Sequence, residues 1–335
     1  MVRIAVDAMG GDHGPSTIVD GAVAAARHLD IAVVLVGDAS RLRDAVAAEF
    51  DGPRLPIEIV DAPDVVAMHE APVAARRRPA SSIRVAAEVV ARGEADALVS
   101  LGHTGATVVA AHAAFGLIPG VERPALAAVV PSRSGSAVLL DAGATVSCKP
   151  THLAQFAIMG SRYASLALGV TEPRVGLLSI GEEATKGNDL TREAHQLLKA
   201  APVRFIGNVE GRDIYGGAAD VVVCDGFTGN VVLKTSEGLV EMVEVLLGEE
   251  LAGTFSSQVG SLLSRRAFRR FRRRVDYSEY GGAPLLGVSK PVIVGHGRSS
   301  AKAVRNAVAA AARFATADVV ARVAADVSVQ RAAEV

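Results

Sequence analysis

The sequence predicts an α/β protein in which helices cover both faces of a mostly parallel sheet. Two patterns predict it: short, almost wholly apolar runs recur along the chain, and longer amphipathic stretches separate them. Strands that are apolar on both sides are typical of parallel sheets buried on both faces. In addition, 50% of the 335 residues are hydrophobic and 21% are charged, so the chain can bury a sizeable core.

The first part of the chain alternates regularly between strand and helix. Apolar periodicity predicts helices over 16–29, 40–50, 81–93 and 104–115. Ser81 is a suitable N-cap for the third helix, and Gly93 is a suitable residue to end it. The strands that precede these helices are expected at 2–8, 31–38, 55–63 and 96–102.

The alternation changes after residue 124. Residues 124–143 predict two antiparallel strands joined by a short turn between Ser132 and Gly135. Further strands are expected at 174–181, 203–209, 220–226 and 291–297. Further helices are expected at 151–168, at 190–200, from Gly229 past Leu247, and at 301–316 as the closing element. No repeat or separating linker is visible, so one domain over 1–335 is expected.

Composition narrows the function classes. The net charge of −1 argues against a general attraction to nucleic acid. No run of about 18 apolar residues is present, and the chain begins directly with a strand, so neither a membrane span nor a signal peptide is expected. Cys148 and Cys224 stand far apart and form no CxxC pair, which favours inert core thiols in the reducing cytoplasm.

Polar, glycine-containing segments follow seven of the expected strands. In open α/β sheets, ligands bind beyond the carboxyl ends of the strands. A single Gly-Gly turn would indicate little, but seven such segments on one edge predict a shared site. The segments are 7–15, 100–107, 141–150, 179–189, 206–211, 224–230 and 295–300.

The residue types favour an anion as the ligand. Glycines before helix N-termini expose backbone N–H groups, and Lys149, Lys186 and Lys234 add positive charge. The histidines have no metal-ligand spacing, and no GxSxG elbow is present. Asp141 is equally suited to accepting hydrogen bonds from turn amides, and His195 is expected on the surface of its helix.

Four segments resemble a known family. They are IAVDAMGGDHGP at 4–15, QFAIMGS at 155–161, GNVEGRDI at 207–214 and CDGFTGNVVLKTSEG at 224–238. Together they resemble the bacterial phosphate acyltransferase family called PlsX, from Ile4 to about Phe314. The resemblance implies a three-layer α/β/α sandwich similar to the isocitrate and isopropylmalate dehydrogenases and the phosphotransacetylases. It also implies a homodimer that associates peripherally with the membrane.

The resemblance implies a reaction as well. The family transfers a fatty acyl group from acyl carrier protein to inorganic phosphate, and the acyl phosphate feeds phospholipid synthesis through a downstream membrane acyltransferase. Because phosphate is already anionic and a thiolate leaves readily, we expect a direct displacement without a covalent enzyme intermediate, metal or cofactor.

Two segments depart from the pattern of the family. His103 and Leu101 stand where the family commonly has Asn and Ala, and Thr145 and Ser147 stand where it commonly has Asn and Asp. Because the other loops are intact, we expect these changes to mark a subgroup with the same activity.

The polar loops contain the residues that we expect to form the site. The expected catalytic residues are Lys186, as a cationic contact, and Asp225 or His296, as a base. The residues expected to bind phosphate or acyl phosphate are Asp7, Gly10, Gly11, Asp12, His103, Thr104, Gly105, Asn188, Asn208, Glu210, Thr228, Gly229 and Asn230.

An arginine-rich segment at 265–274 carries seven arginines, within an expected helical protrusion at 237–280. Apolar residues recur near it at helical spacing, so it suits an anionic bilayer, an acidic carrier protein or plain solvent. The rival functions are an acyl-CoA-dependent phosphotransacetylase, a decarboxylating dehydrogenase of similar fold, and a non-catalytic membrane scaffold.

Overall fold

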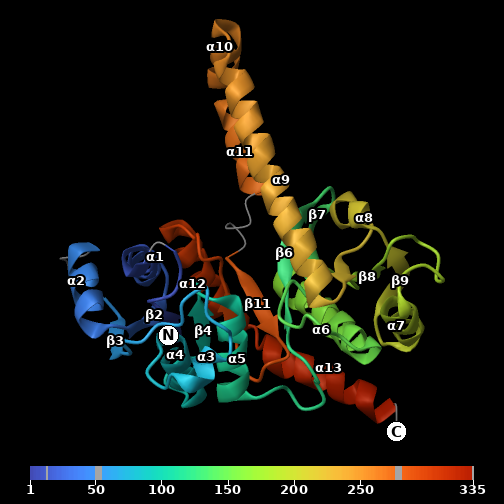
Figure 1. Cartoon of the computed structure of the whole chain (residues 1–335), viewed down its shortest axis with the longest axis horizontal. Helices are drawn as coiled ribbons and strands as arrows, with labels where there is room; N and C mark the ends of the chain where they lie inside the picture. Colours follow the sequence, from blue (N-terminus) through green and yellow to red (C-terminus); the bar gives the residue numbers. More distant parts are fainter. Residues whose placement is uncertain (13, 50–54, 276–280, 334–335) are drawn as a thin grey trace.

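The strands form two mixed sheets that lie side by side. The structure is a computed structural model and describes residues 1–12, 14–49, 55–275 and 281–333 (Figure 1). The seven-stranded sheet has the order β3 (Ile57–Asp61), β2 (Ile31–Gly37), β1 (Val2–Asp7), β4 (Ala97–Ser100), β12 (Val292–Val294), β11 (Ala283–Leu286), β5 (Ala125–Leu126). The five-stranded sheet has the order β6 (Ala128–Ser132), β7 (Gly135–Leu140), β10 (Val221–Val223), β8 (Arg174–Leu178), β9 (Arg204–Val209).

Both sheets are mostly parallel, which confirms the expected α/β class. Only β11, which runs antiparallel to β12 and β5, and β6, which runs antiparallel to β7, depart from this. The expected hairpin is present, with Ser132 opposite Gly135. Its first strand, however, is divided between the sheets: β5 ends at Leu126 and β6 begins at Ala128. The chain therefore passes from one sheet to the other at Ala127.

Helices cover both faces of the first sheet. Alternate residues of β1 point to opposite sides: Ile4 packs with α1 (Gly14–His28) and α12 (Ala301–Thr316), and Ala5 packs with α4 (Ser82–Ala91) and α5 (Thr104–Phe115). The remaining helices of this half are α2 (Ala39–Glu49) and α3 (Ala74–Arg77). Ser81 occupies the expected N-cap position, but its hydroxyl donates to the carbonyl of Arg78 instead.

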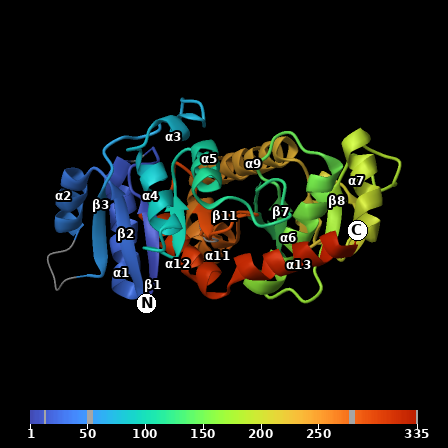
Figure 2. The same ribbon diagram turned by 90° about the horizontal axis from the view of Figure 1, so that it is seen from below.

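The second sheet is also covered on both faces. One face carries α6 (Pro150–Leu168), α7 (Asp189–Ala200) and α13 (Val319–Ala333), and α13 runs along the lower side of Figure 2. The other face carries α8 (Gly211–Gly216) and the first turns of α9 (Gly226–Ala252). The closing element is therefore α13, not the expected 301–316 helix, which ends at Thr316 before a turn at Asp318.

The prediction for His195 was wrong. His195 is buried on the inner face of α7, where its Nδ1 lies 2.9 Å from Oδ1 of Asn208 and its ring meets Phe205 edge-on. The apolar residues of α7 are few, so the buried face includes this polar ring, whose hydrogen bond compensates for its loss of water.

Three helices form a long projection from the body. The outer part of α9, with α10 (Phe255–Leu263) and α11 (Arg265–Val275), extends far from both sheets (Figure 1). Residues 276–280 of the expected protrusion lie outside the described part. No helix within the described ranges is long and apolar enough to cross a bilayer.

Candidate functional site

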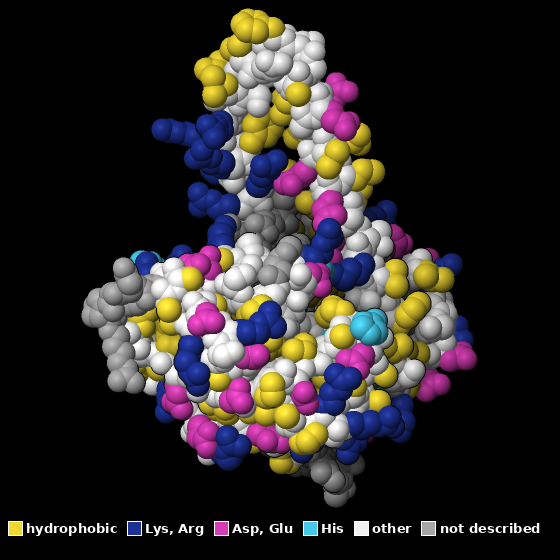
Figure 3. All heavy atoms as spheres, turned by 60° about the vertical axis from the view of Figure 1, so that its left-hand side comes forward, with side chains coloured by type: hydrophobic (Ala, Val, Ile, Leu, Met, Phe, Trp, Pro, Cys, Tyr) yellow, Lys and Arg dark blue, Asp and Glu magenta, His cyan; other side chains and the backbone are white. Residues whose placement is uncertain are grey.

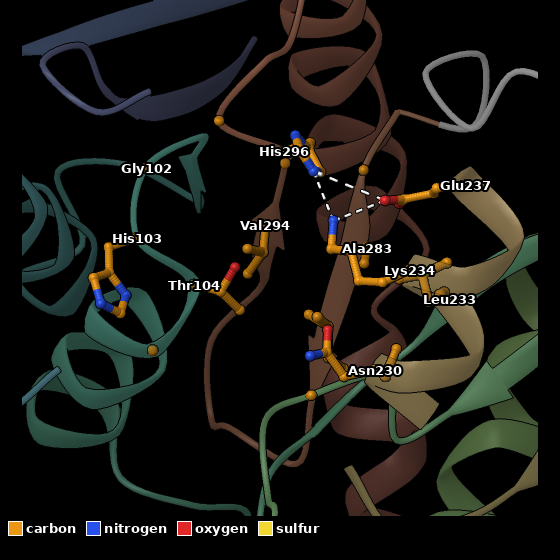
Figure 4. A pocket seen from close by; sticks show the side chains of 18 of the residues that line it. Gly102, His103, Thr104, Asn230, Leu233, Lys234, Glu237, Ala283, Val294 and His296 are labelled. Atoms are coloured by element: carbon orange, nitrogen blue, oxygen red, sulfur yellow. Dashed lines mark hydrogen bonds and ion pairs between the residues drawn. The ribbon is translucent and has the colours of Figure 1, made fainter. Parts of the chain in front are cut away.

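A cleft of about 440 Å³ lies between the two sheets. The loops after β1, β4, β7 and β12 line it, together with the first turns of α9. Figure 4 shows His103 and Thr104 on one side and Asn230, Lys234 and His296 on the other. Five of the seven expected site segments therefore contribute to the cleft, although they belong to two sheets, whereas segments 179–189 and 206–211 do not.

Glycines allow the loops on one side of this cleft to pack backbone against backbone. A Cβ on Gly10 would lie 2.7 Å from Cα of Gly102, and a Cβ on Gly11 would lie 3.1 Å from the carbonyl oxygen of Gly297. Gly11 also has a φ of +91°, which favours glycine. The Gly10–Gly11 pair therefore allows the loops after β1, β4 and β12 to pack closely against one another.

His103 caps the helix that points into the cleft. It is the N-cap of α5, and its Nδ1 accepts a hydrogen bond from the amide of Ala106 at 3.3 Å, while Nε2 lies 3.0 Å from the carbonyl oxygen of Glu70. The ring thus takes the capping role that Asn, Asp, Ser or Thr most often has at a helix N-terminus. Thr104 and Gly105 are the first two residues of α5, so their amides have no acceptor within the helix. The N-terminus of α5 therefore offers free donors and a positive dipole end.

Three side chains form a charged cluster on the opposite wall. The Lys234 ammonium donates to Oε2 of Glu237 at 2.8 Å and to Nε2 of His296 at 2.7 Å. Burial, together with the adjacent Lys234 charge, lowers the pKa of His296. The lowered pKa favours the neutral ring, whose two nitrogens face the Lys234 ammonium and the amide of Arg298, the latter at 3.2 Å. The ring therefore already has partners and is not poised to take a proton from substrate.

Two buried aspartates hold the loops in place. Asp141 accepts hydrogen bonds from the amides of Leu126, Gly143, Ala144 and Thr145, at 2.6–3.0 Å. Burial raises its pKa, and these four amides oppose the shift. Its interpretation as an acceptor for turn amides is confirmed.

Asp7 is comparably enclosed. It accepts from the hydroxyl of Ser100 at 2.9 Å, it is 3% exposed, and burial raises its pKa. It does not line the cleft, whereas Asp12 does. Asp7 thus joins β1 to β4, and of the two acids only Asp12 is placed to meet a ligand.

Several expected site residues lie outside the cleft lining. Asn188 caps α7, Asn208 bonds to His195 and Glu183, and Glu210 caps α8. Lys186 is exposed on the loop after β8. These residues follow β8 and β9, and β10 separates those two strands from β7, whose loop lines the cleft.

The residues that start α9 shape its first turn. Asp225 is the N-cap, and its carboxylate accepts from the amide and the hydroxyl of Thr228 at 2.9 and 2.7 Å. Gly229 packs directly on the carbonyl of Asp141. From this turn only Asn230 reaches the cleft lining.

The remaining reactive groups offer no thiolate and no metal-binding cluster. Burial raises the pKa of Cys148 to about 12 and also raises that of Cys224, so neither thiol has the low pKa of a nucleophile. Within the described ranges, no group of three or more His, Cys, Asp or Glu side chains is arranged to hold a metal ion.

Lys234 was expected only to add positive charge, and Glu237 was not among the expected site residues. Both line the cleft with Asn230 and Leu233. The sequence does indicate that these residues lie together, because positions 230, 233, 234 and 237 share one face of a helix. What sequence alone could not indicate was that this face meets the loop after β12.

Comparisons with known proteins identify the family. The family model described as "Fatty acid synthesis protein" matches residues 2–322. The chain is 54% identical to a phosphate acyltransferase of Desulforudis audaxviator over 92% of this chain and 90% of the relative. It is 52% identical to one of Citrifermentans bemidjiense over 94% and 89%, respectively.

Solved structures share the fold at low identity. A phosphotransacetylase from Streptococcus pyogenes superposes with a TM-score of 0.61 at 18% identity, covering 94% of each chain. A branched-chain phosphotransacylase from Enterococcus faecalis gives 0.58 at 15% identity, covering 94% of this chain and 99% of the other. The family match over residues 2–322 and the close full-length relatives show that this chain belongs to the fatty acid synthesis protein family, as the resemblance to PlsX implied.

Proposed function

We propose that this protein transfers a fatty acyl group from acyl carrier protein to inorganic phosphate, giving an acyl phosphate for phospholipid synthesis. The observation that carries the proposal is one cleft with two cationic walls: the N-terminus of α5 on one side and the Lys234 ammonium on the other. Such a cleft suits a phosphate anion. Its close relatives are named phosphate acyltransferases, which indicates that the group transferred to phosphate is an acyl group.

The reaction needs little more than positioning. A phosphate oxygen attacks the thioester carbonyl carbon, a C–O bond forms, and the C–S bond breaks. The thiolate leaves and takes a proton from solvent. The amides of Thr104 and Gly105 and the Lys234 ammonium would hold the phosphate and offset the charge on the carbonyl oxygen. The raised pKa values of both thiols support a route without an acyl-enzyme intermediate.

Trapping the product tests the proposal. The protein is incubated with palmitoyl-acyl carrier protein, with and without phosphate, and acyl phosphate is captured by hydroxylamine. Because hydroxylamine also reacts directly with the thioester, we expect phosphate to raise the hydroxamate yield well above the background without phosphate. A parallel assay with palmitoyl-CoA separates the carrier-dependent activity from that of a phosphotransacetylase. Absence of phosphate-dependent hydroxamate from both donors would reject the function.

Lys186 lies outside the cleft lining, and its role as a cationic contact for the substrate is kept as a proposal. Its ammonium is exposed on the loop after β8, and we expect Lys186→Ala to reduce turnover at least about tenfold because one cationic contact is lost. The melting temperature should not change, since the side chain is in solvent. Near-normal turnover, measured with the hydroxamate assay, would remove Lys186 from the mechanism.

The projection supports a proposal of peripheral contact with an anionic membrane. Phe255, Leu262 and Leu263 at its tip are 82%, 67% and 81% exposed. Arginines of α11 gather on its flank, seen as dark blue beside the yellow tip in Figure 3. An apolar tip with basic flanks suits insertion into the headgroup region.

Liposome flotation measures this contact. We expect the protein to float with vesicles that contain anionic lipid, and a variant with Phe255→Ser, Leu262→Ser and Phe271→Ser to remain in the lower fraction. Ile180→Ser is the matched control, because Ile180 is 81% exposed on the body instead. Equal flotation of the triple variant would exclude the tip as the contact.

We also propose that α9 pairs with a second copy of this chain. Its outer part exposes an apolar set that a monomer would leave in water. The set comprises Leu239, Met242, Val243, Val245, Leu246 and Leu247. Sedimentation equilibrium should give twice the chain mass, and Leu246→Glu should shift the protein to monomer.

A further inference from the structure

We propose that the groove between α9 and β6 binds the hydrocarbon chain of the acyl donor; this assignment rests on the proposed function. The groove has a volume of about 420 Å³, within the range of roughly 300–1,000 Å³ found for small-molecule sites. Its apolar lining comes from Val129, Val130 and Pro131 of β6 and from Leu233 and Val240 of α9. Its polar lining residues are Tyr215, Ser236, Glu237, Glu241, Glu244 and Arg272.

The groove continues directly from the phosphate cleft. Val129, Leu233 and Glu237 line both cavities. The charge of Glu237 is already paired with Lys234 at 2.8 Å, so the junction does not present an unpaired carboxylate to a hydrocarbon chain. A ligand with a reactive group in the cleft can therefore extend into the groove without desolvating an uncompensated charge.

The polar groups inside the groove are also satisfied. The hydroxyls of Tyr215 and Ser236 bond to each other, and the Ser236 hydroxyl lies 2.7 Å from the carbonyl oxygen of Val232. A hydroxyl that is already bonded imposes little penalty when an apolar chain covers it. The carboxylate of Glu241 also lines the groove, but its side chain is 68% exposed, so it can stay in water while a chain lies against the apolar residues.

The length of the groove fits a long chain. The lining residues of α9 run from Leu233 to Glu244, which corresponds to about 16 Å along a helix. At the far end, Arg272 of α11 pairs with Glu244 at 3.3 Å, giving a polar rim. An acetyl group would leave most of this apolar surface in water, so the geometry selects a fatty acyl chain.

Blocking the groove tests the assignment. Val240 lines the groove but not the cleft, and it is half-buried on the surface of α9. Each buried methylene group strengthens binding of an acyl chain about fourfold. A tryptophan at position 240 that displaces three methylene groups of the palmitoyl chain should therefore weaken its binding by roughly 60-fold. We expect Val240→Trp to lower the ratio of kcat/KM for the palmitoyl donor to kcat/KM for the butyryl donor by this factor. Val240→Leu should lower it less. Leu197→Trp on exposed α7 is the control and should leave the ratio unchanged.

A binding measurement separates this inference from the proposed function. Wild-type protein and Val240→Trp are titrated with a fluorescent polyene fatty acid, and palmitate competes for the site. Weaker probe binding in Val240→Trp than in wild type supports the groove as the site for the hydrocarbon chain. If no donor yields acyl phosphate, that result rejects the proposed function but not the groove assignment. Unchanged probe affinity, or activity with an unchanged chain-length ratio, would overturn the groove assignment. A folded Val240→Trp variant is verified by an unchanged melting temperature.

Discussion

Replacing Lys234 with methionine is expected to lower kcat/KM for phosphate by about 100-fold, at the lower end of the effect of losing one charge-stabilising donor, because the Lys234 side chain is 48% exposed. Methionine keeps most of the length of the side chain and removes only the cation. The Lys234 ammonium stands in the cleft wall opposite the N-terminus of α5, held by Glu237 and His296. Steady-state kinetics with varied phosphate should show most of the loss as a higher KM for phosphate, with the KM for the acyl donor little changed.

A second measurement distinguishes loss of the cation from general damage. The Lys234 charge is one cause of the lowered pKa of His296, after burial. Lys234→Met should therefore raise the pKa of His296 in an NMR titration. Lys199→Met, a change on exposed α7, is the control and should alter neither quantity. An unchanged KM for phosphate in Lys234→Met would remove Lys234 from the anion site.

The arrangement of Lys234 also bears on the choice of general base. His296 was a candidate from sequence because it follows a strand, and Asp225 was a candidate for the same reason. In the structure each side chain already has a local partner: His296 accepts from Lys234, and Asp225 accepts from Thr228. If phosphate binds as an anion between Lys234 and α5, as proposed, it needs no strong base, and catalysis by positioning is sufficient.

Most helices and strands could be predicted because their signals are local. The apolar runs and the amphipathic periodicity placed α1, α5 and α9 within a few residues of their observed bounds. The division into two sheets could not be predicted, because it depends on Ala127, whose amide donates to the carbonyl of Pro284 far along the chain. A sequence with apolar residues on both sides of Ala127 reads as one continuous strand.

The site was partly predictable because some of its signals are also local in the sequence. Strand-end glycines and polar residues selected the loops that carry Asp12, Thr104 and His296, which meet in the cleft. Which loops meet is a property of strand order, and β8 and β9 lie on the far side of β10. The polar residues after those two strands therefore looked equivalent in sequence to residues of the cleft, although Asn188 and Glu210 cap helices in the structure.

Gly229→Ala is expected to destabilise the protein by about 3 kcal/mol, near the upper end for overpacking a tight contact. A Cβ at this position would lie 1.9 Å from the carbonyl oxygen of Asp141 and 2.9 Å from Sγ of Cys224. The first obstacle is backbone, held by the buried Asp141 loop, so α9 must move. At about 2–4 °C per kcal/mol for a chain of this kind, calorimetry should show a melting temperature lower by roughly 6–12 °C. Displacement of the first turn should also lower activity, because Asn230 and Lys234 follow directly on α9.

Gly238 provides a matched comparison on the same helix. It is exposed, and a Cβ there meets no atom within 4 Å. Gly238→Ala should therefore stabilise the protein by about 0.5–1 kcal/mol, because alanine restricts the unfolded chain and favours helix. Opposite signs for the two substitutions would show that Gly229 is required for the close approach of α9 to the Asp141 loop. Similar melting temperatures for both variants would contradict that packing and, with it, the position of Lys234 in the cleft.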